Sequence, residues 1–484
     1  MAFPRKSHSF AKNYIVMELT RNYIEELKKN SNGKLKLFVS QVKKDNAKVI
    51  YLLDNLGKLP RNFDGTWIYD FAISDNPKIR LGAVKNLGKL KEEKVISFLS
   101  KQIKEEEDTT VRREIVSSIG RQRNPISKDI LLEILKDEDP KIVCQAIRAL
   151  LVFRKDEKII EELKPLVNHQ NEMVRTVIYK EFFAKKKEKS AIPHTETYNY
   201  LKNKVVHGDV RDVLKNVEDE SIHLTFTSPP YYNARDYSIY PSYQDYLDFL
   251  AEVFKEIHRI TKEGRFLIVN TSPIIIPRIS RQHSSKRYPI PFDIHNDLVN
   301  MGWEFIDDVI WLKSEASVKN RNAGFLQHRK PLGYKPNAIT EYLMVYRKET
   351  TRLIDWNIKE YDKKVVNESK VKDGYETSNV WKIDPTFNKV HSAVFPVELC
   401  KRVIQYYSFE GDIVFDPFGG SGTVGRTAKA LNRLFFLTEK DDNYFDYMKK
   451  QAKPNAMFDE QKTEFLELTE FKALKSNDIN TTSD

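Results

Sequence analysis

Residues 411–423 read Gly-Asp-Ile-Val-Phe-Asp-Pro-Phe-Gly-Gly-Ser-Gly-Thr, and the apolar stretch Asn432-Arg-Leu-Phe-Phe-Leu-Thr-Glu439 follows shortly afterwards. The apolar run that ends at Asp416 predicts a buried strand, and the glycines after it predict a tight turn into a helix. Glycines without a Cβ let the backbone of such a turn approach a ligand closely. This segment therefore predicts a strand–turn–helix–strand unit with a ligand site at the turn.

The ligand of this turn is constrained by what the sequence around it lacks. No lysine stands where a P-loop requires one, and the glycines do not follow the dinucleotide pattern Gly-x-Gly-x-x-Gly. Glu439 lies 20 residues after Gly419, at the end of the next strand, which is where a carboxylate accepts hydrogen bonds from ribose hydroxyls. The pattern favours an adenosine-bearing ligand without a pyrophosphate. A tight turn that binds nothing is the alternative.

The chain from about residue 200 onward shows the same alternation of short apolar runs and amphipathic segments. A helix is expected at 246–260, and further strands are expected at 204–209, 221–227, 265–270 (entered through Gly264), 305–312 and 341–347. This alternation predicts an α/β, Rossmann-like fold with a mostly parallel, doubly wound sheet. Its ligands should bind at the carboxyl ends of the strands.

A second motif, Thr227-Ser-Pro-Pro-Tyr-Tyr-Asn233, also stands at the end of a predicted strand. The two prolines have no N–H, so they stiffen the turn and leave their carbonyls free. A hydroxyl, a directed carbonyl and an aromatic ring then stand side by side, a set that can hold an exocyclic amine and stack on its base. The alternative is a Pro-Pro turn with its tyrosines in the core.

Together the two motifs resemble those of DNA amino-methyltransferases that use S-adenosylmethionine. The matching residues are Ser228-Pro-Pro-Tyr231, Phe418-x-Gly-x-Gly422, Gly208-Asp209 and the segment 391–402. The catalytic motif precedes the cofactor motif, which resembles the beta-type circular permutation of that family. The resemblance covers about residues 200–452.

The resemblance implies roles for individual residues. Ser228 Oγ and the Pro229 carbonyl would accept the hydrogens of the target amine, with Pro230 completing the turn, and Tyr231 would stack on the flipped base. The implied cofactor site comprises Asp209 near the adenine, Phe395 and Pro396 along the pocket wall, Asp416, Phe418, Gly420, Ser421, Gly422 and Thr423 around the methionine part, and Glu439 at the ribose. No metal site is expected.

Ser228 rather than Asp in the catalytic motif resembles the cytosine-N4 branch of the family more than the adenine-N6 branch. The resemblance further implies duplex DNA as substrate and a restriction–modification system, in which a cognate restriction endonuclease would act separately. Three other hypotheses stay open: an RNA methyltransferase, a repeat scaffold with an inactive methyltransferase fold, and a nuclease using Glu460-Gln-Lys462.

The charge of the chain favours a polyanionic partner. It carries 80 Lys and Arg against 69 Asp and Glu, a formal net charge of +11, and such an excess is typical of proteins that bind nucleic acid. Candidate DNA-binding residues are Arg278, Arg281, Lys286 and Arg287, and a target-recognition region is expected at about 313–389. For any single one of these cations, a solvated surface position is the better prediction.

The first third of the chain is a repeat. The apolar anchors Ile79, Val111, Ile142 and Val174 are spaced 32, 31 and 32 residues apart, and apolar residues recur four and eight positions after each. This is one face of an amphipathic helix, and an Asp or Asn precedes each anchor where an N-cap belongs. The segment from about 65 to 185 resembles a HEAT-like array, expected to be a binding surface or else a passive spacer or dimerisation arm.

Composition sets the remaining expectations. With 40% hydrophobic and 31% charged residues, the 484-residue chain is globular, and we expect a helical repeat domain at 1–190 and a methyltransferase domain at 191–484. Only two cysteines, Cys144 and Cys400, are present, which excludes a disulfide framework and favours a reducing cytoplasm. No apolar run approaches the length of about 20 residues that a membrane helix needs.

Overall fold

The computed structural model describes residues 19–29, 33–60, 62–183, 192–233, 240–276, 280, 282–283, 285–318, 331–332, 336–386, 395–452 and 462–481. The chain divides into two compact units, Met1–Lys187 and Glu188–Asp484. Among the described residues, no helix is long and apolar enough to cross a membrane.

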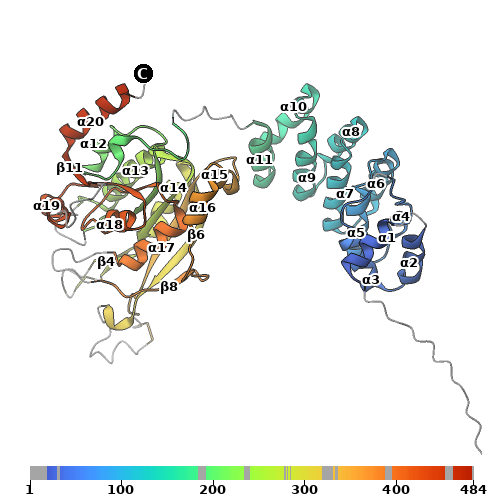
Figure 1. The fold of residues 1–484 in the computed structure, drawn as a ribbon, viewed down its shortest axis with the longest axis horizontal. Coiled ribbons are helices and arrows are strands. Elements are labelled where there is room, and N and C mark those ends of the chain that lie inside the picture. The colour runs from blue at the N-terminus through green and yellow to red at the C-terminus, as the bar shows by residue number, and fades with distance from the viewer. Residues whose placement is uncertain are drawn as a thin grey trace, which may run out of the picture. The chain divides into compact units, whose positions relative to one another are not determined.

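The first unit is built from helices that pack in sequence order (Figure 1). Its helices are α1 (Arg21–Lys29), α2 (Lys34–Val42), α3 (Asn46–Asn55), α4 (Ile68–Ala72), α5 (Pro77–Leu87), α6 (Glu93–Glu105), α7 (Thr109–Arg121), α8 (Pro125–Ile134), α9 (Pro140–Leu150), α10 (Glu157–Leu163) and α11 (Glu172–Ile178).

The four predicted repeat helices are present as α5, α7, α9 and α11, and each packs on the next. Their anchors Ile79, Val111, Ile142 and Val174 are all buried. The side chains of Asn76, Asp108, Asp139 and Asn171 accept hydrogen bonds from the first backbone N–H groups of these helices. These caps satisfy N–H groups that would otherwise lack a partner at a helix start.

Among the described residues, the second unit contains a nine-stranded sheet in the order β11-β1-β10-β9-β2-β3-β7-β6-β8. All neighbouring strands are parallel except β3–β7 and β7–β6, so the expectation of a mostly parallel sheet is confirmed. The strands are β1 (Lys204–His207), β2 (Ile222–Thr227), β3 (Thr261–Thr271), β6 (Trp303–Leu312), β7 (Thr340–Lys348), β8 (Val380–Lys382), β9 (Ile413–Asp416), β10 (Leu434–Glu439) and β11 (Glu464–Glu467). A separate hairpin pairs β4 (Ile274–Ile276) with β5 (Lys286–Tyr288).

Helices cover both faces of this sheet. Alternate side chains of β9 illustrate the arrangement, since Phe415 packs in one hydrophobic core and Val414 in the other. The first core is closed by α12 (Val210–Leu214), α13 (Tyr243–Ile260), α14 (Ile290–Asn300) and α20 (Leu468–Thr481). The second is closed by α17 (Val397–Tyr407), α18 (Thr423–Ala430) and α19 (Asp442–Gln451).

One sequence expectation is wrong in detail. The strand expected to begin after Gly264 starts already at Thr261 and passes through Gly264, whose φ is +71°. The region 313–389, where target recognition is predicted, also contains β7 and β8 of the main sheet. Long-range pairing with β3 and β6 recruits these strands into the sheet.

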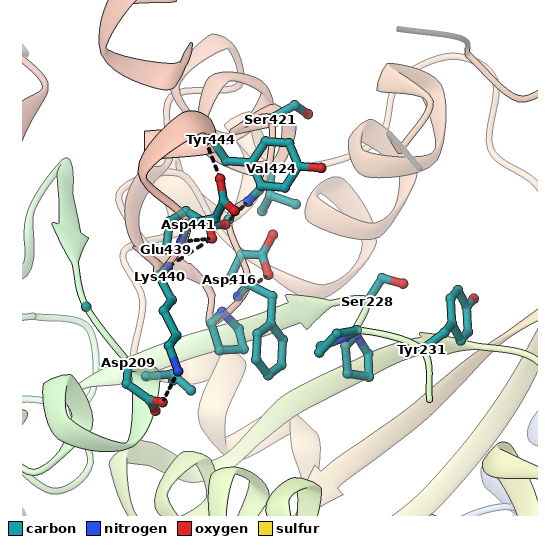
Figure 2. Close-up of a pocket in the computed structure, with 18 of the residues that line it drawn as sticks. Asp209, Ser228, Tyr231, Asp416, Ser421, Val424, Glu439, Lys440, Asp441 and Tyr444 are labelled. Atoms are coloured by element: carbon teal, nitrogen blue, oxygen red, sulfur yellow. Dashed lines mark hydrogen bonds and ion pairs between the residues drawn. The ribbon is translucent and has the colours of Figure 1, made fainter. Parts of the chain in front are cut away.

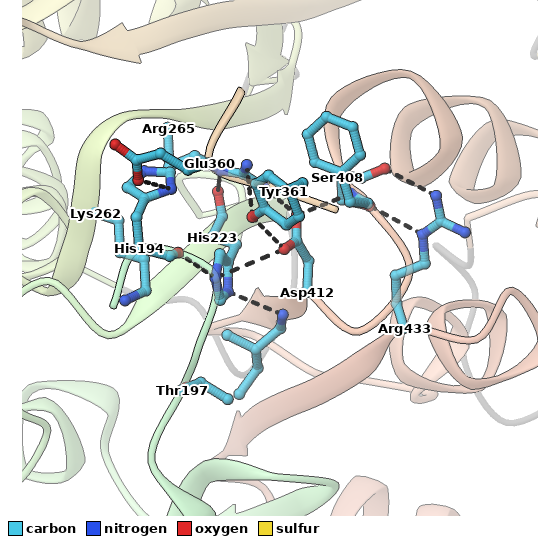
Figure 3. A network of polar contacts seen from close by, with 12 residues as sticks. His194, Thr197, His223, Lys262, Arg265, Glu360, Tyr361, Ser408, Asp412 and Arg433 are labelled. Carbon is cyan, nitrogen blue, oxygen red and sulfur yellow. Dashed lines mark hydrogen bonds and ion pairs between the residues drawn. The ribbon is translucent and has the colours of Figure 1, made fainter. Parts of the chain in front are cut away.

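A buried polar network ties together the amino ends of β2, β3 and β9 (Figure 3). Asp412 accepts hydrogen bonds from Arg265 and, at 2.6 Å, from the Tyr361 hydroxyl. His223 Nδ1 accepts the backbone N–H of Ile413 at 3.1 Å, and burial lowers the His223 pKa to about 3, so the ring is neutral. The network holds these strands in register, which positions the motifs at their opposite, carboxyl ends.

Candidate active site

A cavity of about 530 Å³ lies at the carboxyl ends of β1, β2, β9 and β10. Most of its walls come from the four loops that follow these strands, and Phe249 and Phe395 complete the lining, so segments far apart in sequence meet there (Figure 2). β9 and β2 are neighbours at the centre of the sheet although about 190 residues separate them in sequence. Such a point, where the order of strands reverses, is where open α/β sheets bind their ligands.

The glycine turn after β9 forms one wall of the cavity. The Gly420 backbone N–H donates to Glu439 Oε2 at 2.7 Å, while Lys440 and Asp441 donate their N–H groups to Oε1. Gly420 and Gly422 have φ values of +51° and +74°, and residues with a Cβ rarely adopt this backbone conformation. Glu439 is thereby fixed at the end of β10, and its carboxylate retains capacity for a further donor such as a ribose hydroxyl.

Asp416 joins the cofactor motif to the catalytic motif. Its Oδ1 accepts the Thr227 hydroxyl at 2.8 Å and the Phe418 N–H at 3.1 Å. Burial raises the pKa of this carboxyl to about 8, although both hydrogen bonds act to lower it. Asp416 is therefore a poorly solvated carboxyl at the cavity wall, which a cationic ligand would stabilise in its ionised form.

Asp209, after β1, lies at the other end of the cavity from Ser228 and Tyr231 (Figure 2). Burial alone would raise its pKa, but hydrogen bonds and charge from Arg211, together with Lys440, lower the pKa to about 2. The Lys440 ammonium is 3.2 Å from Asp209 Oδ2. Asp209 is thus ionised and available as a hydrogen-bond acceptor.

The catalytic motif lines the same cavity, with Ser228, Pro229, Pro230 and Tyr231 all in its wall. The Tyr231 hydroxyl donates to Glu341 Oε2 at 3.3 Å. Glu341 in turn pairs with the ammonium of Lys313, and both side chains are largely buried. The ring of Tyr231 is therefore held by a carboxylate from β7, a contact between residues 110 positions apart.

Most of the predicted site residues meet in this cavity. The lining includes Asp209, Phe395, Asp416, Phe418, Gly420, Ser421, Thr423 and Glu439 in addition to the catalytic motif, whereas Pro396 and Gly422 do not line it. Pro396 instead caps α17 and Gly422 caps α18.

Two of the four predicted DNA-binding residues belong to the described part of the chain, and neither of them lines the cavity. Arg278, Arg281, Glu460 and residues 391–394 fall outside the described residues. Lys286 and Arg287 are exposed on β5. The next residue, Tyr288, packs against Tyr232 with ring centroids 4.9 Å apart. The hairpin is therefore anchored beside the catalytic motif.

Sequence reasoning missed several residues of the site. Tyr240, Phe249, Lys440, Asp441 and Tyr444 also line the cavity. The last three follow Glu439 closely, so their position at the end of the strand could have indicated that they line the site. The Arg211 guanidinium lies 5.2 Å above the ring of Phe249. The sequence did not indicate Phe249 as a site residue, because it lies on a helix expected only to fill the core.

The cavity suits a cationic adenosine derivative. It combines the carboxylates of Asp209, Asp416 and Glu439 with the aromatic rings of Phe249, Phe395 and Phe418. Carboxylates attract a sulfonium and an ammonium group, rings accept a flat base, and the residue at the end of β10 can accept hydroxyls. The residues present therefore fit S-adenosylmethionine.

We expect the affinity for S-adenosylmethionine to depend on pH through Asp416. The pKa of Asp416 is about 8 without ligand, and a bound cation favours the carboxylate, so binding below pH 8 releases a proton. Affinity should weaken by up to about tenfold for each pH unit below 8. Calorimetry in buffers of different ionisation enthalpy would measure both the affinity and the proton released.

Asp416→Asn is the control, because it should remove this proton release while other titrations persist. The free energy of unfolding of the ligand-free protein should change with pH in the opposite direction to the affinity, so it should fall as pH rises. The folded pKa lies above the ordinary value of 3.8, so the contribution of Asp416 is fully present at low pH and is lost as pH rises towards 8. An unchanged proton count in Asp416→Asn would contradict the assignment.

Residues 222–450 match the model of a protein family described as DNA methylase, and residues 67–151 match the model of HEAT repeats. The chain is 29% identical over 272 residues to the Type II beta methyltransferase M.BslI of Bacillus sp. (strain NEB-606), which covers 53% of this chain and 29% of that relative. It is 27% identical over 270 residues to the Type II methyltransferase M.ScaI of Streptomyces caespitosus, covering 52% of this chain and 81% of that relative.

A solved structure from Thermus thermophilus, named as a DNA modification methylase and complexed with S-adenosyl-L-methionine, is similar at 24% identity and a TM-score of 0.41. It covers 51% of this chain and 92% of that one. The chain spans less than a third of the length of M.BslI. Within the second unit, residues 222–450 are therefore similar in sequence to the family described as DNA methylase.

Proposed function

We propose that this protein transfers a methyl group from S-adenosylmethionine to the exocyclic N4 amine of cytosine in duplex DNA. One observation carries the proposal: the catalytic motif Ser228–Tyr231 and the cofactor residues Asp416 and Glu439 line one cavity. Thr227 and Asp416 are joined directly by a hydrogen bond of 2.8 Å. A methyl donor and a target base held by these two sets of residues would therefore be neighbours.

The residues act by orienting the amine. Its lone pair is delocalised into the ring, and acceptors on its two hydrogens localise the pair on nitrogen; Ser228 Oγ and the Pro229 carbonyl supply them. The bound cofactor supplies an electrophilic methyl group. As the nitrogen–carbon bond forms and the sulfur–carbon bond breaks, positive charge develops on the amine, and these oxygens stabilise it until a proton leaves to solvent.

A covalent enzyme intermediate has no part in this scheme. Cys144 and Cys400 are both buried, and burial raises the pKa of each thiol. Cys400 lies on α17, and Cys144 belongs to the repeat unit. Neither cysteine lines the cavity, which supports methylation of an amine rather than of a ring carbon.

The choice of cytosine N4 over adenine N6 rests on Ser228. A serine in the first position of the catalytic motif resembles the cytosine-N4 branch of the family. A role in restriction and modification is part of the proposal, supported by the Type II relatives M.BslI and M.ScaI. Lys286 and Arg287 on the hairpin beside Tyr232 are proposed contacts to DNA phosphates.

Expression in cells that lack DNA methylases, followed by long-read sequencing and mass spectrometry of nucleosides, tests the proposal. N4-methylcytosine at a defined sequence is the expected product. N6-methyladenine would overturn the base assignment and keep the enzyme class. Modified RNA with unmodified DNA, or no modification despite cofactor binding, would overturn the proposed substrate.

We further expect Glu341 to act as a positioning residue for Tyr231. Glu341→Ala removes the acceptor of the Tyr231 hydroxyl and leaves Lys313 without its carboxylate. The ring should then stack less well on the target base, lowering kcat/KM for DNA by about tenfold, equal to about 1.4 kcal/mol. Single-turnover methylation with radiolabelled cofactor measures this, together with fluorescence of 2-aminopurine at the target position.

Tyr231→Phe separates positioning from folding. The substitution removes the hydroxyl but keeps the ring. The double variant Tyr231→Phe/Glu341→Ala should lower kcat/KM little more than either single change, since both changes remove the same contact. Cofactor affinity should stay unchanged in all three. Fully additive losses would show that Glu341 acts independently of Tyr231.

A further inference from the structure

One edge of the repeat unit is formed by the carboxyl ends of α3, α5, α7 and α9 and the turns that follow them; we call it the turn edge. Lys89 Nζ after α5 donates to the Gly57 carbonyl after α3 at 2.8 Å. Gln122 after α7 donates to the Gly88 carbonyl at 3.2 Å. Gly120 packs against Ala149 so closely that a side chain would not fit. The four helix ends therefore lie in a row.

The turn edge is rich in positive charge. Its exposed basic residues are Lys58, Lys85, Lys89, Lys91, Arg121, Arg123, Arg148, Arg154 and Lys155. The opposite edge, formed by the turns that lead into α5, α7 and α9, is acidic and carries Asp75, Glu106, Glu107, Asp108, Asp137, Glu138 and Asp139. Ion pairs such as Arg80–Glu106 join neighbouring turns on that acidic edge. Cations thus outnumber carboxylates in the turns of the turn edge, which also hold Glu92 and Asp156, and carboxylates predominate in the turns of the opposite edge.

Helix dipoles explain only part of this pattern. Lys85, Arg121 and Arg148 occupy last turns of helices, where a cation is stabilising. Lys91, Arg123 and Lys155, however, come just before the amino ends of α6, α8 and α10. The helix dipole disfavours cations there, so stability of the helices does not account for them.

The positive charges on the turn edge are also crowded. Lys89 has its pKa lowered by partial burial and then by the nearby cations Arg121, Lys28 and Lys85. Lys28, at the end of α1, donates to the Leu56 carbonyl at 2.6 Å, which places its ammonium at the same edge. Lys28 pairs with Glu25 and Arg121 with Glu114. The remaining like charges repel one another, and a polyanion lying along the edge would relieve that repulsion.

We propose that the turn edge binds the phosphate backbone of duplex DNA without reading its sequence. The proposal rests on the proposed function, which makes DNA the polyanion that this chain engages. A row of cations on successive helix ends suits an extended chain of phosphates. A backbone contact of this kind adds affinity for any DNA and leaves the choice of target to the methylase domain.

The test compares two sets of substitutions in the full chain. One variant replaces Lys91, Arg123, Arg154 and Lys155 on the turn edge with Gln. The matched control replaces Lys78, Lys104, Lys136 and Lys141, which are exposed on the opposite edge. Each variant loses four positive charges, so net charge changes equally. Fluorescence anisotropy with a labelled duplex, in increasing salt, reports the affinity and the number of phosphate contacts.

The turn-edge variant should bind DNA at least about tenfold more weakly, and the slope of log affinity against log salt should fall by about 0.9 for each lost contact. The control should keep most of the wild-type slope. Equal losses of DNA affinity in the two variants would mean that only net charge matters, and would overturn the proposal. Displacement of the duplex by polyglutamate at equal charge concentration would also overturn it. Cofactor affinity, unchanged in both variants, shows that they are folded.

The same variants separate this proposal from the proposed function. If the turn edge binds DNA but the proposed reaction is wrong, the loss of affinity will appear while nucleoside analysis shows no N4-methylcytosine. If the reaction is right but the turn edge is not a DNA surface, the turn-edge variant will methylate and bind DNA as the control does.

Discussion

Ser228→Ala is expected to lower the rate of methyl transfer by on the order of 100-fold or more, with unchanged affinity for S-adenosylmethionine. The loss follows from removing one oriented acceptor at the reacting nitrogen, where charge develops only in the transition state. Ser228 lines the cavity after β2, whereas the proposed cofactor contacts come from the loops after β1, β9 and β10 and from Phe395 before α17. Single-turnover methylation at saturating cofactor, alongside calorimetry, would resolve the two effects.

Ser242→Ala serves as the control for this substitution. Ser242 is an exposed serine that caps α13 and does not line the cavity, so the rate should stay at the wild-type level. Wild-type turnover in Ser228→Ala would remove the hydroxyl from the mechanism. A loss of cofactor affinity together with the loss of rate would instead place Ser228 in the cofactor site.

Gly420→Val is expected to weaken S-adenosylmethionine binding by on the order of 100-fold while the protein remains folded. The φ of Gly420 is +51°, so a β-branched residue is strained there by roughly 1–2 kcal/mol or more. Its N–H holds the Glu439 carboxylate at 2.7 Å, and a shift of the turn would move that carboxylate away from the ribose. Calorimetry measures the affinity, and circular dichroism reports folding.

Gly374→Val is a matched control for backbone strain. Gly374 has a φ of +72° and lies in an exposed loop, where a Cβ added to it would meet no heavy atom within 4 Å. The two substitutions impose similar strain, but only the one at Gly420 lies at the cavity. Equal affinities in the two variants would show that the glycine turn does not bind the cofactor.

Local pattern was sufficient for much of the fold. The spacing of Ile79, Val111, Ile142 and Val174 predicted the four repeat helices because a helix buries one residue per turn on the same face. The apolar run before Asp416 and the glycines after it predicted a strand, a turn and a helix start, all present in β9 and α18. These features depend on neighbours within about ten residues, which a sequence shows directly.

The site was predictable as two motifs but not as one cavity. Thr227 and Asp416 are 189 residues apart, and Tyr231 and Glu341 are 110 apart. Their contacts depend on the order of strands in the sheet, with β9 beside β2 and β7 beside β3.

By itself the sequence determined the helices and strands, their buried faces and the chemical groups at the strand ends, because backbone geometry imposes periods of 3.6 and 2 on local patterns. Only the tertiary structure decided which strand ends are neighbours, that Glu341 holds Tyr231, and that cations on successive turns gather along one edge of the repeat unit. The physical reason is that strand pairing and helix stacking bring together residues whose separation in sequence no local period records.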